Sequence, residues 1–490
     1  MSVTSVPASG ASGTSGGPGA SFARLRAEEY GYLDRKGHVY LDHTGAGLPA
    51  ESQLAAHAAR ITGDCFGNPH SENPTAAASD RLVAETRAAV LRHLNADPDE
   101  YAAVFTANAS GACRVVGEAY RFGRGSRLVL PLDNHNSVNG LREFARAKGA
   151  RTVHVPFAGQ ELRISEEALL QALGPRPGPR GLLRRPGARA GARNGLLAYP
   201  AQSNFTGVQH PLEWIEAAQR LGYDVLLDAA AYLPSNRLDL GRVHPDFVTV
   251  SWYKVFGYPT GIGCLVARRE ALARLRRPWF SGGTIQVVSA QGEWHRMTDD
   301  ETAFEDGTLN FLSIPDVATG LGYVQGIGID AVHDHVTGLT AGLLEGLRAL
   351  RHGNGAPLVR LYGPETTERR GGSVTLNLLH PDGTVVDERI VSRESSARGI
   401  SLRTGCFCNP GAGEGAFGIP RRLLSGAVRR TTGTIDDYLT RLGLPSGGAV
   451  RVSLGLSSNQ ADVDALLGFL AEVYRDRRRG DEQLSPRLRC

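Results

Sequence analysis

The chain has 490 residues, too many for one compact hydrophobic core, so we expect about two or three domains. Hydrophobic residues make up 41% and charged residues 21%, and no apolar run is long enough to form a membrane-spanning helix. The net charge is +4, and residues 174–194 hold six arginines and no acid. Because this segment lacks interleaved aromatics, we expect an exposed insertion rather than a nucleic-acid site.

The two ends and the cysteines set the cellular context. Residues 1–21 carry no charged side chain and lack the pattern of a signal peptide, so they predict a disordered tail on a cytoplasmic protein. Residues 22–37 predict an N-terminal helix that packs on a small domain, and residues 479–490 a charged tail. The six cysteines show no disulfide spacing, which favours reduced thiols.

From residue 38 onward the chain alternates between strand and helix patterns. The predicted strands are 38–42, 102–106, 127–131, 151–156, 195–199, 224–228, 247–251, 263–267, 372–379, 400–403 and 449–454. The predicted helices are 50–63, 74–95, 109–121, 137–149, 211–221, 329–352, 387–398 and 460–477. This order predicts an α/β large domain over 38–325, with a mainly parallel but mixed sheet of the seven-stranded type, and a smaller α+β domain over 326–478.

One lysine stands out because of its surroundings. The β-branched run Phe247–Ser251 predicts a buried strand, and Lys254 follows it, between aromatic residues and a Gly/Pro-rich segment. This pattern places Lys254 in a loop at the strand end. Desolvation lowers the pKa of a lysine side chain and makes it a nucleophilic amine suited to a Schiff base. An ordinary loop lysine would give the same local pattern.

Other polar residues follow the ends of neighbouring strands, where ligands of parallel sheets gather. Ala109 and Ser110 open a helix and could hold a phosphate; His135 could stack on a flat ring; Asn204 lies in a strand-end loop; and Asp228 ends an apolar strand. Together with Lys254 they match the needs of pyridoxal phosphate, whose ring nitrogen pairs with an acid. The glycine fingerprint of a nicotinamide site is absent.

Several motifs, in order, resemble the class V aminotransferase superfamily of pyridoxal phosphate enzymes. They are Val39–His43, Gly67–Ser71, Asp228 with Ser251–Lys254, Glu305–Asn310 and Arg403–Gly411. The last of these is similar to the cysteine loop of molybdenum cofactor sulfurases, specifically of their cysteine-desulfurase part. The resemblance extends from about residue 38 to residue 472.

The resemblance implies roles for individual residues. Lys254 would carry the cofactor and act as its catalytic base, with Asp228 on the pyridine nitrogen, His135 on the ring and Asn204 on the 3-oxygen. Ala109, Ser110 and Ser251 would hold the phosphate, and Thr308 would reach the phosphate of a second subunit in a homodimer. Arg451 would bind the carboxylate of the substrate, which the resemblance implies is L-cysteine.

The cysteine loop would supply the sulfur-accepting thiolate. The resemblance favours Cys408, with Cys406 as the second choice, and the two would point in opposite directions if the loop is extended. Arg403 would be a second substrate-binding residue beside Arg451, and it could also help to hold the thiolate. A Cys-x-Cys pair could also be part of a metal site, but the chain has no second pair with ligand spacing, so we expect no metal.

Two differences from molybdenum cofactor sulfurases leave the sulfur acceptor unidentified. The eukaryotic members continue into a C-terminal cofactor-binding domain, whereas this sequence stops at Cys490, and the third cysteine of their loop is Gly413 here. Ala231 stands where simpler desulfurases often have Gln or His. The alternatives are another class V reaction, such as a C–S lyase, a β-eliminase or an aminotransferase, or a non-catalytic protein that keeps the fold.

Overall fold

The computed structural model describes residues 18–69, 71–174, 193–425, 434–444, 446–480 and 484–487. Most of the expected arginine-rich insertion, 175–192, lies outside the described residues, as do residues 1–17 of the expected tail. Within the described ranges no helix is both long and apolar enough to cross a membrane.

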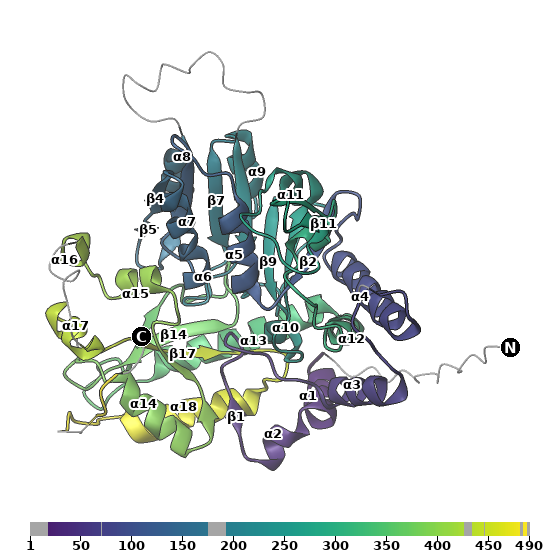
Figure 1. Ribbon diagram of the computed structural model, residues 1–490. Helices are drawn as coiled ribbons and strands as arrows, with labels where there is room; N and C mark the ends of the chain where they lie inside the picture. The colour runs from purple at the N-terminus through teal and green to yellow at the C-terminus, as the bar shows by residue number, and fades with distance from the viewer. Residues whose placement is uncertain are drawn as a thin grey trace.

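A seven-stranded sheet forms the centre of the large domain (Figure 1). In spatial order its strands are β2 (Tyr101–Thr106), β10 (Gly263–Arg268), β9 (Phe247–Ser251), β8 (Tyr223–Asp228), β7 (Gly195–Pro200), β3 (Arg127–Pro131) and β4 (Arg151–Val155). β10 is antiparallel to both of its neighbours, while β9, β8, β7, β3 and β4 pair in parallel. The predicted mixed, mainly parallel sheet is therefore confirmed.

Both faces of this sheet are buried, because successive residues of a strand enter different hydrophobic clusters. In β7, Leu196 and Ala198 join one cluster, and Leu197 and Tyr199 join the other. The helices over the first face are α5 (Ala109–Ala119), α6 (Asn136–Asn139), α7 (Leu141–Ala147) and α11 (Arg269–Arg274). Helices of the large domain that join the second cluster include α4 (Pro74–His93), α8 (Glu166–Leu173), α9 (Trp214–Arg220) and α12 (Ile314–Ile327).

The small domain is built on a second, antiparallel sheet in the order β13-β14-β17-β16. Its strands and helices are α13 (Ile329–Ala349), β13 (Val359–Tyr362), β14 (Ser373–Leu378), α14 (Glu388–Ala397), β15 (Ile400–Ser401), β16 (Arg403–Gly405), α15 (Pro410–Ala416), α16 (Arg421–Ser425), α17 (Ile435–Arg441), β17 (Ala449–Ser453) and α18 (Gln460–Tyr474). β1 (Val39–Tyr40) pairs in parallel with β15, so this strand is attached to the small domain.

The remaining elements are short or connect these two sheets. They are α1 (Pro18–Glu29), α2 (Gly31–Arg35), α3 (Glu51–Gly63), β5 (Phe157–Ala158), β6 (Arg163–Ile164), α10 (Trp252–Phe256), the hairpin β11 (Ile285–Ser289) and β12 (Trp294–Met297), and a 3-10 turn over Glu301–Phe304.

The structure corrects three details of the sequence prediction. The N-terminal helix starts at Pro18, inside the expected tail, and a break at Tyr30 divides it into α1 and α2. The helix expected over 137–149 is two helices, α6 and α7, which meet at Gly140. Lys254 lies in the short helix α10, which follows β9 directly, and not in a loop. Apolar periodicity alone does not detect such short breaks and helices.

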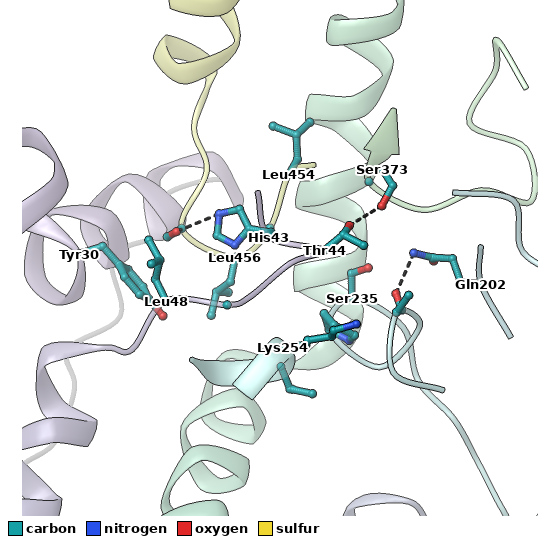
Figure 2. A pocket seen from close by; sticks show the side chains of 17 residues that line it. Tyr30, His43, Thr44, Leu48, Gln202, Ser235, Lys254, Ser373, Leu454 and Leu456 are labelled. Carbon is teal, nitrogen blue, oxygen red and sulfur yellow. Dashed lines mark hydrogen bonds between the residues drawn. The ribbon is translucent and has the colours of Figure 1, made fainter. Parts of the chain in front are cut away.

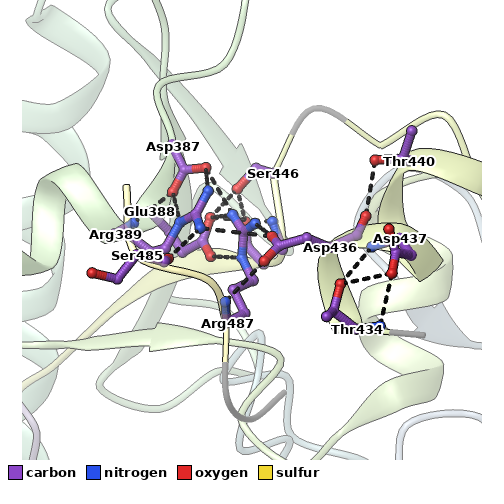
Figure 3. Close-up of polar contacts among 12 residues, drawn as sticks. Asp387, Glu388, Arg389, Thr434, Asp436, Asp437, Thr440, Ser446, Ser485 and Arg487 are labelled. Carbon is purple, nitrogen blue, oxygen red and sulfur yellow. Dashed lines mark hydrogen bonds and ion pairs between the residues drawn. The ribbon is translucent and has the colours of Figure 1, made fainter. Parts of the chain in front are cut away.

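The C-terminal segment 484–487, expected as part of a charged tail, docks onto the small domain through Arg487 (Figure 3). The Arg487 guanidinium lies 2.7 Å from both Asp387 and Glu388, and it also pairs with Asp436 of α17. Arg389 donates to the Ser485 carbonyl at 2.7 Å. The segment thus connects α14 to α17.

Replacing Arg487 with alanine should destabilise the protein by about 3 kcal/mol, because the nearly buried Glu388 carboxylate loses its cation. Urea unfolding measures the change. The matched control is Arg479→Ala, since Arg479 is an exposed arginine of the same terminal region. Equal effects of the two substitutions would contradict a specific role for the docked segment.

Candidate active site

A cavity of about 340 Å³ opens at the carboxyl ends of the central strands. Seven of the predicted site residues line it together: Ala109, Ser110, His135, Asn204, Asp228, Ser251 and Lys254. They come from the five chain segments at or directly after the ends of β2, β3, β7, β8 and β9, and the sheet brings these ends to one edge. The sequence therefore identified the walls of one cavity.

Lys254 and Asp228 form the charged part of this cavity. Asp228 ends β8, and its Oδ1 accepts hydrogen bonds from the Thr249 hydroxyl (3.2 Å) and the Ala230 amide (3.0 Å). Burial lowers the pKa of the Lys254 amine; the Asp228 carboxylate counteracts this, and the positive charges of Arg451 and Arg403 lower the pKa further. A lowered pKa increases the neutral, nucleophilic fraction of the amine.

His135 presents a neutral ring to the cavity. Its Nδ1 accepts a hydrogen bond from the Ser137 backbone N–H at 3.1 Å, which places the ring proton on Nε2. Burial lowers the pKa of His135, and the positive charge of Lys254 adds to this effect, although Asp228 opposes it. An uncharged imidazole with a fixed orientation suits stacking on a heterocycle.

The N-terminus of α5 closes the opposite end of the cavity. Asn108 caps the helix by accepting the Gly111 N–H at 2.9 Å, and the Ala109 N–H donates to the Ser251 hydroxyl at 3.3 Å. Gly263 permits the loop to lie directly on β10, because a Cβ there would come within 2.4 Å of the Asn108 carbonyl carbon. Backbone amides and hydroxyls at a helix N-terminus form a suitable phosphate site.

These residues fit pyridoxal phosphate. The helix end and hydroxyls suit its phosphate, the imidazole its ring, the strand-end carboxylate its pyridinium nitrogen, and the desolvated amine its aldehyde. Thr308 does not line this cavity and is exposed, on the segment that follows the 3-10 turn. Whether it reaches a second subunit stays a prediction.

Arg451 lies at the domain boundary, almost fully buried. Its Nη1 donates to the Asn204 carbonyl at 2.8 Å and its Nη2 to Asp42 Oδ1 at 2.9 Å, while its guanidinium lies 4.9 Å from the centre of the Phe407 ring. Its Nε is buried and has no hydrogen-bond partner among the described residues. An orphaned donor on a buried cation indicates that an anionic group can bind there.

Arg403 forms an ion pair with Asp42, and it does not line the cavity. Its Nε and Nη2 donate to Asp42 Oδ2 at 2.9 and 2.6 Å, and this bonding raises the pKa of the arginine. Burial opposes ionisation of Asp42, but the two arginines lower its pKa below the usual value. Asp42 was not among the predicted site residues, although its place at the end of the first predicted strand was visible in the sequence.

The cysteine loop is a tight turn and not the extended segment considered from the sequence. Phe407 and Cys408 both have φ of 54°, a left-handed conformation that costs on the order of 1 kcal/mol or more per non-glycine residue. The Phe407 carbonyl accepts from the Asn204 side chain, and the Cys408 carbonyl accepts from the Asn136 amide, both at 2.7 Å. Cys408 is exposed, whereas Cys406 is half-buried.

A buried carboxylate, Asp133, joins this loop to the cavity walls. Its Oδ1 accepts from Asn409 Nδ2 at 2.7 Å and from the Ser203 hydroxyl at 2.8 Å, and its Oδ2 lies 3.0 Å from His210 Nε2. Asn409 also donates to Asn204 Oδ1 at 3.0 Å. Neither Asp133 nor Asn409 was predicted to belong to the site, because their partners are distant in the chain.

A smaller chamber lies beside the cavity and shares Lys254, Gln202 and Ala231 with it. Figure 2 shows the Lys254 side chain below Thr44, and the His43 ring above Leu456. The imidazole of His43 is buried, lies 3.3 Å from the Ser457 hydroxyl and meets Tyr40 edge-on. Burial lowers the pKa of His43 to about 4.

Among the described residues, no group of three or more metal-ligating side chains is present.

The comparisons with known proteins agree with this geometry. Residues 188–466 match the family model "Aminotransferase class-V". The chain is 34% identical over 481 residues to a molybdenum cofactor sulfurase from Arabidopsis thaliana, which covers 92% of this chain and 58% of that protein. It therefore spans less than two thirds of the length of this relative.

Two solved structures share the fold. The apo structure of a cysteine desulfurase from Thermococcus onnurineus NA1 superposes with a TM-score of 0.73 at 22% identity, covering 92% of this chain and 98% of that chain. A complex of the cystine C-S lyase C-DES with its product cysteine persulfide superposes with a TM-score of 0.67 at 18% identity, covering 91% and 99%.

The buried His43 predicts a loss of stability in mild acid. Its pKa is about 4 in the folded protein and near 6.5 when unfolded, so the unfolded chain binds a proton first as the pH falls. This differential binding should cost about 2 kcal/mol between about pH 7 and about pH 5. Asp42 opposes the shift, and Arg26 adds to it.

The measurement is urea unfolding of the wild type and His43→Gln at both pH values. The glutamine variant should lose less stability over this interval, since it has no proton to gain at this position. Identical pH dependence in the two proteins would show that His43 is not the group responsible.

Proposed function

The chain belongs to the class V aminotransferase family and is a pyridoxal phosphate enzyme, and from this premise we propose that it is a cysteine desulfurase. It would convert L-cysteine to L-alanine and leave the sulfur as a persulfide on Cys408. The observation that carries the proposal is the cysteine loop: Cys408 is exposed on a turn that is hydrogen-bonded directly to Asn204 of the cofactor cavity.

The residues of the cavity divide the chemistry among them. When bound, the cofactor supplies an electron sink for charge that develops at the substrate α-carbon. Lys254 anchors the cofactor and, with its lowered pKa, takes the α-proton from the substrate. Asp228 keeps the ring nitrogen protonated, and His135 holds the ring from one face. Arg451 binds the substrate carboxylate through its unpartnered Nε.

Sulfur transfer then needs a single nucleophile. The Cys408 thiolate attacks the substrate sulfur, an S–S bond forms, and the C–S bond of the substrate breaks. The electron pair of the C–S bond stays with the substrate carbon, which takes up a proton and leaves as alanine. The left-handed turn at Phe407 and Cys408 fixes the backbone that carries the thiol, so this part of the loop does not need to be ordered during the reaction.

Incubation of the purified holoenzyme with L-cysteine tests the proposal, with alanine, pyruvate and protein-bound sulfur measured together. Cys408→Ala should lower alanine release by at least about a hundredfold and abolish the bound sulfur, because the nucleophile is missing. The visible absorbance of the cofactor should persist. Cys406→Ala is the matched control and should keep most of the activity.

The same assay distinguishes the alternative reactions. Pyruvate without protein-bound sulfur would favour elimination, as in a C–S lyase, and full alanine release by Cys408→Ala would overturn the role of this cysteine. No reaction with L-cysteine, but transamination of another amino acid, would favour an aminotransferase.

We also propose a homodimer in which Thr308 contacts the phosphate bound by the second subunit. The neighbouring hairpin of β11 and β12 supports this, because the exposed fractions of Val287, Val288 and Trp294 are 48%, 44% and 54%. The Gly307 backbone N–H donates to the carbonyl of Gly282, which lies just before β11. The segment of Thr308 therefore lies beside the start of this hairpin. Exposed apolar groups of this size mark interaction surfaces.

Sedimentation equilibrium should give a dimer, and Trp294→Asp should weaken it. Thr308→Ala should then raise the dissociation constant of the cofactor by about tenfold to a hundredfold, the effect of one hydrogen bond to a charged group. A monomer that binds the cofactor as tightly as the dimer would contradict the shared site.

A further inference from the structure

Asp42 is shared by two arginines that the chain brings together from different strands. Arg451 lies in β17 and Arg403 in β16, and these two residues are paired across the small sheet. Arg403 makes a close two-nitrogen contact with the Asp42 carboxylate, at 2.6 and 2.9 Å, and Arg451 makes one contact, at 2.9 Å. Asp42 and Arg451 are both buried, whereas the Arg403 side chain is half exposed.

This arrangement is closely packed. Gly45 lies against the Asp42–Arg403 pair, and a Cβ at this glycine would come within 2.4 Å of Asp42 Oδ2 and 2.7 Å of Arg403 Nη2. The carboxylate cannot easily change partners while this turn is in place. The position of Asp42 between the two guanidinium groups is therefore defined by the backbone as well as by charge.

The charges do not balance within this group of three. One carboxylate faces two guanidinium groups, so the group carries a net charge of +1. If Asp42 were paired with Arg451 alone, the two charges would cancel, and the buried guanidinium would attract an incoming anion only weakly. Arg403 satisfies Asp42 from the exposed side and leaves the charge of Arg451 available.

The donor atom of Arg451 that is still without a partner shows where an anion could bind to this charge. Its Nη1 is taken by the Asn204 carbonyl, its Nη2 contacts Asp42, and one face is covered by Phe407. Nε is buried and unpartnered among the described residues. A carboxylate approaching this edge would meet a donor with a fixed direction.

We propose that Arg403 is a positioning residue that neutralises Asp42, so that Arg451 keeps its charge for a single substrate carboxylate. Arg403 does not contact the substrate in this arrangement, which differs from the direct contact suggested by the sequence resemblance. Asp42 holds the Arg451 guanidinium in place and limits the site to a net charge of +1. The inference rests on the proposed function, in which Arg451 binds the carboxylate.

The test uses 3-mercaptopropionate, which has one carboxylate and one thiol but no amine that could react with the cofactor aldehyde. Its dissociation constant for the holoenzyme is measured by calorimetry, in parallel with thermal unfolding. Arg403→Gln should raise the dissociation constant by about tenfold, because Asp42 then cancels the charge of Arg451. Arg403→Lys, which keeps the charge, should stay within about threefold of the wild type.

Asp42→Asn provides the opposite change. It should bind the probe at least as tightly as the wild type, since the competing negative charge is gone. The double variant Asp42→Asn with Arg403→Gln should recover the affinity lost in Arg403→Gln. No change in Arg403→Gln, or a double variant as weak as Arg403→Gln, would overturn the proposal.

The proposed function can fail separately. If the wild type releases no alanine from L-cysteine while the probe affinities follow the expected order, the reaction is different but the carboxylate site stands. If alanine is formed and the probe affinities do not follow this order, the role of Arg403 is wrong and the desulfurase assignment is unaffected.

Discussion

The arrangement of the site depends on the hydrogen bonds of one buried carboxylate, that of Asp133. It has no access to water, so it must be satisfied by protein donors, and these come from the segments of Ser203, His210 and Asn409. Asp133 itself lies two residues before His135. A single buried carboxylate therefore holds together the segment of His135, the loop of Asn204 and the cysteine loop, which belong to two different domains.

The sheet and the cavity walls could be predicted because their signals are local. The apolar run before Asp228 and the β-branched run before Lys254 each identify a buried strand, and parallel strands bring their ends to one edge. Knowledge of this edge was enough to group six of the seven predicted residues that line the cavity, and Ser251 came from the family resemblance. The mainly parallel character of the sheet could be predicted for the same reason, whereas its strand order, including the position of the antiparallel strand β10, could not.

The rest of the site depends on contacts between residues far apart in the chain. Asp42 meets Arg451 across 409 positions, and Asp133 meets Asn409 across 276, and no periodic pattern encodes either pair. The turn at Phe407 and Cys408 was missed for a related reason. Two non-glycine residues in the left-handed region are locally unfavourable, and they persist because Asn136 and Asn204 bind the carbonyls of the turn.

The net positive charge around Asp42 affects Lys254 as well as the carboxylate site. Burial is the main reason for the lowered pKa of Lys254, and the positive charges of Arg451 and Arg403 lower it further. A negative carboxylate bound at Arg451 offsets part of this electrostatic effect, so the proton affinity of the amine rises when the site is filled. A lysine amine whose lowered pKa rises when the carboxylate binds is suited to take a proton from the bound molecule and not from solvent. Recognition of the anion and readiness of the base are thus two consequences of the same unbalanced charge.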